Sequence, residues 1–66
     1  MQNSAEKNQE IVQQLRNISE TLADRSLAAL KDAHALGESK RPEIERTLTQ
    51  ARRAIEKAIA LLISES

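Results

Sequence analysis

The residues that could perform catalysis are scattered along this chain without the neighbours that would activate them. Serine and threonine hydroxyls are present, but the only histidine is His34 and there is no cysteine. A hydroxyl becomes a useful nucleophile only beside a base, and one histidine on the edge of a helix does not provide that pairing. The carboxylates are spread over helix faces with no enclosed pocket to tune them for acid–base work. We therefore expect no catalytic residues and no enzymatic activity.

Residues that could hold a ligand are equally sparse. One histidine without cysteine cannot build a structural zinc site, and a single glycine, Gly37, cannot form a glycine-rich phosphate loop. Because the chain has no aromatic residue, it also lacks rings on which bases could stack. We expect no metal, no cofactor and no small-molecule substrate, and we read His34 as a solvated residue near a helix end.

Three basic residues line up on the outer side of the predicted C-terminal helix: Arg46, Arg53 and Lys57. Small dimeric hairpins can present such a row to RNA, as the Rop-type plasmid copy-number proteins do. The chain carries ten basic and ten acidic residues, however, and Glu43 lies near the same face. With no net field to attract nucleic acid, a solvated face is the favoured interpretation, and a Rop-like nucleic-acid-binding dimer stays an alternative.

The size of the chain points to a partner. Sixty-six residues make one domain at most, and a chain this small buries a modest share of its surface when no disulfide or metal stabilises it. Self-association or a protein partner would supply the missing burial. The longest apolar run, residues 58–63, is far below the roughly 20 residues that span a bilayer, and no apolar signal core opens the chain. We expect a cytoplasmic protein without a membrane contact.

Two residues interrupt the helical pattern, Gly37 and Pro42. The segments on either side lack further glycine and proline and show no strand-like alternation. The pattern predicts a helix over about residues 4–36, a turn over about 37–41 and a helix over about 42–64. Gly37 suits the left-handed position just after a helix.

The helix ends carry further signals. Asn3, with Glu6 three residues later, fits a capping box at the start of the first helix. Pro42 fits the first turn of the second helix, where its missing N–H is not needed. The cap of that helix is Ser39 or Arg41, and the sequence does not decide between them.

Each predicted helix has an apolar stripe, so the fold class is all-α, an antiparallel two-helix hairpin resembling a coiled coil. The stripe of the first helix contains Ile11, Val12, Leu15, Ile18, Leu22, Ala23, Ala29, Leu30, Ala33 and Leu36. The stripe of the second contains Ile44, Leu48, Ala51, Ile55, Ala58, Ile59 and Leu62. Arg52 lies at the rim of the second stripe, where an intrahelical ion pair with Glu56 or Glu45 is expected. Residues 1–66 are treated as one hairpin, completed by a partner or by dimerisation.

Two features suggest where a partner binds. A chain that folds back at Gly37 brings Ile44 beside Leu36 and Leu62 beside Ile18, which leaves the start of the first helix without a neighbour. The end of the second helix is apolar almost all round and cannot direct every side chain inward. The predicted partner-binding residues are therefore Ile11, Val12, Leu15, Leu61, Leu62 and Ile63.

The turn Gly37-Glu38-Ser39-Lys40 and the ending Ala58-Ile59-Ala60-Leu61-Leu62-Ile63 resemble the small E-type co-chaperones of type III secretion systems. The resemblance implies a hairpin that joins a larger TPR-like chaperone and helps to hold the needle subunit in the cytoplasm. It covers roughly residues 36–63. Pro42, the single glycine and the lack of aromatic residues depart from the family, and no functional residue is carried over individually.

The functional expectation is a non-enzymatic protein–protein interaction module, an adaptor or co-chaperone that binds a helical partner, in type III secretion if the resemblance holds. The alternative from the residues alone is a homodimeric four-helix bundle with a structural or regulatory role, beside the Rop-like dimer already mentioned.

Overall fold

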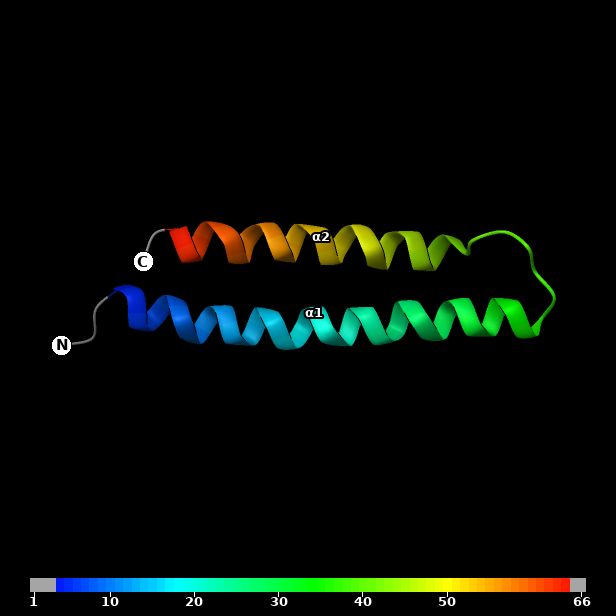
Figure 1. The fold of residues 1–66 in the computed structure, drawn as a ribbon, viewed down its shortest axis with the longest axis horizontal. Helices are drawn as coiled ribbons and strands as arrows, with labels where there is room; N and C mark the ends of the chain where they lie inside the picture. The colour runs from blue at the N-terminus through cyan, green and yellow to red at the C-terminus, as the bar shows by residue number, and fades with distance from the viewer. Residues whose placement is uncertain (1–3, 65–66) are drawn as a thin grey trace.

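The computed structural model describes residues 4–64 as two antiparallel α-helices joined by a short linker (Figure 1). Helix α1 runs from Ser4 to Ala35 and helix α2 from Glu43 to Ser64. The predicted all-α hairpin is confirmed, and the observed helix bounds differ from the predicted ones by one residue at most. The predicted cap Asn3 lies outside the described residues.

The end of α1 is closed as the sequence predicted. Gly37 has φ +78°, in the left-handed region that residues with a Cβ rarely adopt. Its N–H donates to the carbonyl of His34 at 3.0 Å, and the N–H of Glu38 donates to the carbonyl of Ala33 at 3.0 Å. These two bonds form a Schellman motif, which satisfies carbonyls that the last helical turn leaves unpaired.

The start of α2 differs from the prediction. Pro42 takes the cap position itself, because its carbonyl accepts the N–H groups of Glu45 at 3.2 Å and Arg46 at 3.3 Å. Ser39 does not serve as the cap, and Arg41 directs its guanidinium to the Glu45 side chain instead. The predicted choice between these two caps is therefore wrong.

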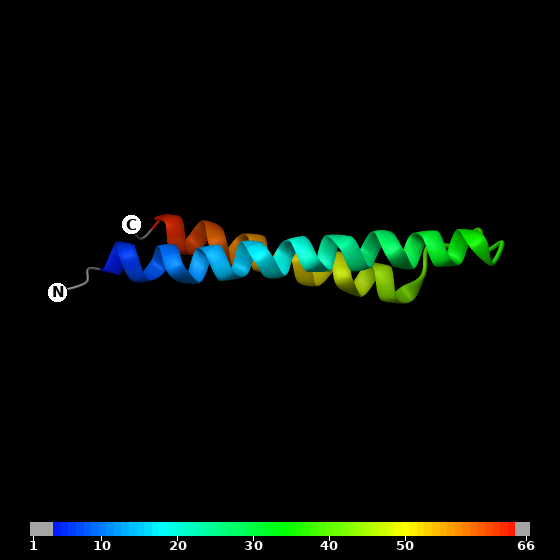
Figure 2. The same cartoon turned by 90° about the horizontal axis from the view of Figure 1, so that it is seen from below.

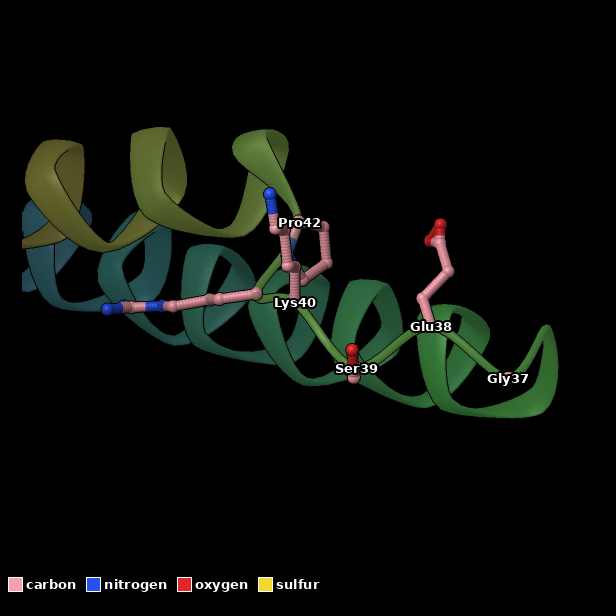
Figure 3. A pocket seen from close by; sticks show the side chains of 6 residues that line it. Gly37, Glu38, Ser39, Lys40 and Pro42 are labelled. Carbon is pink, nitrogen blue, oxygen red and sulfur yellow. The ribbon is translucent and has the colours of Figure 1, made fainter.

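The linker is extended rather than tightly turned. Figure 3 shows it running from Gly37 at the tip, past Glu38 and Ser39, back alongside the last turns of α1 to Pro42. Five extended residues cover about 16 Å, which equals the rise of roughly ten helical residues. The linker thus delivers the start of α2 well behind the end of α1.

This shift corrects the predicted register. The Asn8 side-chain amide donates to the carbonyl of Leu62 at 3.3 Å, and Arg52 Nε donates to Ser19 Oγ at 3.3 Å. Leu62 therefore lies beside Asn8, not beside Ile18 as predicted. The start of α1 is covered by α2, and the predicted unpaired segment there is wrong.

The seam between the helices follows a heptad repeat, in which inward positions alternate three and four residues apart. In α1 the positions with this spacing are Asn8, Val12, Leu15, Ser19, Leu22, Ser26, Ala29 and Ala33, all buried or half-buried, and Ala23 beside them is half-buried as well. In α2 the same spacing gives Glu45, Leu48, Arg52, Ile55, Ile59 and Leu62. Several isoleucines and leucines of the predicted stripes lie on the flanks of this seam, and polar residues occupy some of its positions.

The result is a thin rod rather than a globule. Its Cα atoms extend over 56 × 14 × 10 Å, with a radius of gyration of 15.6 Å against about 11 Å for a compact chain of this length. Figure 2 shows α2 crossing α1 at a shallow angle, with no further layer on either helix. Among the described residues the buried apolar side chains are Val12, Ala33 and Ile59. No helix in residues 4–64 is long and apolar enough to cross a membrane.

Candidate protein-binding face

The seam divides the surface of the rod into two faces that differ in charge. Residues flanking the seam on one side are called the uncharged face. They are Ile11, Gln14, Ile18 and Thr21 from α1 and Ile44, Thr47, Ala51, Ala54, Ala58 and Leu61 from α2. Within each helix these residues recur every three or four positions, which places them on one side.

A groove at the linker end shows that the two helices contribute to the same face. It is lined by Arg25, Ala28, Ala29, Asp32, Ile44 and Leu48. Arg25 and Asp32 continue the row of Ile11 and Ile18 at intervals of seven residues, so Ile44 of α2 lies on the same side as that row. Charge is thus found on this side of α1 at both ends: Arg25 and Asp32 lie at the linker end, and Lys7, seven residues before Gln14, lies at the other.

Large aliphatic side chains are exposed on the uncharged face. Ile11 is 44% exposed and Ile18 49%, whereas Ile44 and Leu61 reach 58% and 60%. Half-buried leucines and isoleucines of the seam form the floor between them. Exposed aliphatic side chains gathered on one side of a small protein are a common feature of surfaces that bind other proteins.

The opposite face is charged. Its groove is lined by Arg16, Ser19, Glu20, Glu56 and Ile59. Leu27 and Leu30 of α1 and Ile63 of α2 are exposed on this side at 52%, 40% and 49%, beside the charged residues. Scattered exposed leucines of this kind are ordinary on protein surfaces and do not define a binding site.

The six predicted partner-binding residues are not brought together. Ile11 and Leu61 lie on the uncharged face, whereas Ile63 lies on the charged side. Val12 is 8% exposed within the seam, and Leu15 and Leu62 are half-buried there. Ile18 and Ile44 were assigned to the hairpin core because hydrophobicity alone does not distinguish the centre of a seam from its flank. The heptad spacing through Ser19, Ser26 and Glu45 was the signal that could have separated them.

A polar cluster is buried at the linker end of the seam. The Glu45 side chain is 7% exposed, and Arg41 donates to its carboxylate from both Nε and Nη2, the latter at 3.0 Å from Oε1. Thr49 Oγ1 donates to the same Oε1 at 2.9 Å. The hydrogen bonds from Arg41, more than that from Thr49, hold the pKa of Glu45 below its usual value, although burial opposes the shift. The same carboxylate raises the pKa of Arg41.

A second polar pair occupies the next layer of the seam. Arg52 reaches across to Ser19, so the predicted intrahelical ion pair of Arg52 is replaced by an interhelical hydrogen bond. Ser26 lies seven residues after Ser19, and Glu45 lies seven residues before Arg52. Because the helices are antiparallel, these equal steps from the Ser19–Arg52 pair place Ser26 in the same layer of the seam as Glu45. Ser26 Oγ is buried without a hydrogen-bond partner. Polar residues at such positions fix the register of coiled coils at some cost in stability.

The other candidate sites offer less. The hollow under the linker is lined by the linker itself, Gly37 to Pro42 (Figure 3). In the described part of the chain, no three histidines or carboxylates gather where a metal ion could bind. His34 is exposed in the last turn of α1, and Arg46, Arg53 and Lys57 are exposed on α2.

Comparison of the chain with protein-family models, with curated proteins and with solved structures finds no match.

Proposed function

We propose that this chain is a non-enzymatic protein–protein interaction module whose uncharged face binds a helical partner. The observation that carries the proposal is the segregation of exposed aliphatic side chains from charge along one side of the rod. Charged side chains on the other side keep the hairpin hydrated, while the uncharged side offers a strip that only another apolar surface can cover.

The apolar surface that stays exposed on the uncharged face favours association with a partner. Full burial of an isoleucine or leucine side chain is worth about 1.5–3 kcal/mol, and roughly half of that is still available at Ile18 and Leu61. The hairpin has few buried apolar residues of its own, so an association that supplies a second layer also stabilises its fold.

The geometry suits an amphipathic helix as the occupant. A shallow floor runs along the two antiparallel helices. It is flanked by Ile11 and Ile18 on α1 and by Ile44, Ala58 and Leu61 on α2. A third helix lying along this floor would insert side chains at three- and four-residue intervals, which is the mode by which helices bind grooves.

Capture from native lysate with the purified chain as bait tests the proposal. The informative variant is Ile11→Asp with Leu61→Asp, which places unpaired carboxylates on the uncharged face without touching a buried seam residue. The matched control is Arg46→Ala with Arg53→Ala on the outer side. Loss of the captured protein in the aspartate pair and retention in the alanine pair supports the proposal. The reverse result, with steep weakening by salt, would support nucleic-acid binding instead.

The resemblance to the E-type co-chaperones makes this proposal more specific. On that basis the partner is a TPR-like chaperone, with which the chain holds a needle subunit in the cytoplasm. Co-expression with such a chaperone and its needle subunit tests this point. A stable ternary complex that the aspartate pair abolishes would support it, and co-purification of neither protein would oppose it.

A further inference from the structure

The amount of exposed surface indicates how much of the hairpin a partner would cover. The chain exposes 5359 Å². A folded monomer of 7.4 kDa exposes about 4,200 Å², so the excess is on the order of 1,000 Å². A stable protein–protein interface buries about 800 Å² on each partner. One further layer on one face therefore accounts for the excess.

The uncharged face of one hairpin can pack against the uncharged face of a second copy. Its residues carry no charge, and the chain as a whole has zero net charge at pH 7, so two copies do not repel each other. Two hairpins joined through these faces make a four-helix bundle in which each hairpin is one layer. The charged sides of both hairpins then face water.

The ends of the face set the orientation of the two copies. Near the chain termini Lys7, seven residues before Gln14, borders Ile11 and Leu61, whereas at the linker end Arg25 and Asp32 border Ile44. If the copies lie head to tail, the end of one copy that holds Lys7 meets the end of the other that holds Asp32, so opposite charges are brought together. If the linkers lay at the same end, the two Lys7 side chains would meet instead, and their like charges would repel each other.

We infer that, when the protein is alone in solution, a second copy of this chain occupies the uncharged face, with the two linkers at opposite ends of a four-helix bundle. This inference rests on the proposed function, because it names the occupant of the same face. The twofold axis crosses the rod near its middle, and Ile18 of each copy is buried by the other.

A distance between labels on the two linkers tests the inference. Because the chain has no cysteine, Ser39→Cys in the exposed linker provides one labelling site per chain. Electron–electron dipolar spectroscopy on the spin-labelled full chain should give an intermolecular distance that approaches the 56 Å length of the rod. Ile18→Asp should abolish this distance, and Leu27→Asp on the charged side should preserve it.

Two results would overturn the inference. One is the absence of an intermolecular distance at a concentration well above the micromolar range. The other is a distance on the order of 20 Å, about two helix spacings, which linkers at the same end would give. Either result leaves the proposed function standing if the lysate partner still depends on Ile11 and Leu61. If the expected intermolecular distance is not found and no lysate protein depends on Ile11 and Leu61, the uncharged face is not a binding surface.

Discussion

Aspartate at Ile18 should separate the binding role of the uncharged face from the general cost of placing a charge on α1. Ile18 and Leu27 are large aliphatic residues of the same helix, 49% and 52% exposed in the hairpin, and they differ in face. Ile18→Asp removes about 1 kcal/mol of apolar burial per copy, because roughly half of a full isoleucine burial remains to be gained on association. It also buries an unpaired carboxylate, which costs several kcal/mol more.

The expected effect on self-association follows from that sum. A loss of about 3 kcal/mol or more per copy corresponds to a Kd weaker by at least about 100-fold for each copy changed. Sedimentation equilibrium should show that Ile18→Asp is monomeric over the range in which the wild type and Leu27→Asp are dimeric. Circular dichroism of all three proteins would confirm that the helices persist. Equal weakening by both substitutions would refute the assignment of the binding face.

The polar seam and the core give three further predictions. The depressed pKa of Glu45 contributes stability that is complete above its unfolded value near 4.5 and is lost as the pH falls through the folded pKa. As the pH falls, the free energy of unfolding should therefore decrease less in Glu45→Gln than in the wild type. The same pH profile in both proteins would argue against a stabilising role for the cluster. Ile55→Ala should cost about 2 kcal/mol and exposed Arg53→Ala less than about 0.5 kcal/mol in denaturant melts, and similar values would show that the seam is misassigned. Ser26→Ala should leave stability unchanged or raise it by up to about 1 kcal/mol, because it removes a buried hydroxyl without a partner; a clear loss would indicate an unseen hydrogen bond.

Much of the fold could be predicted because local signals agree with one another. Gly37 ends α1 through its positive φ, and the apolar periodicity on either side of the linker leaves no competing structure. The register could not be predicted, since it depends on whether residues 38–42 turn tightly or extend. The sequence carries little information on that choice, because residues 38–42 are compatible with either conformation.

The binding face was only partly predictable for a related reason. Ile11 was identified, but through an unpaired segment that does not exist, whereas Leu61 was identified because the end of the second helix is apolar almost all round. Hydrophobicity placed Ile44 inside and Glu45 outside, whereas the structure buries Glu45 against Arg41 and exposes Ile44. A buried carboxylate is acceptable there because a neighbouring guanidinium and hydroxyl satisfy it, which composition alone does not reveal.

The most direct test of the account compares two isoleucine methyl groups in the unmodified protein. Ile18 and Ile63 are each 49% exposed in the hairpin, the first on the uncharged face and the second on the charged side. A soluble paramagnetic probe added to the concentrated protein enhances the relaxation of methyl groups that it can approach. The account predicts that Ile18 is shielded by its partner and relaxes much more slowly than Ile63. Equal enhancement at the two methyl groups would contradict it, because the uncharged face would then be open to water.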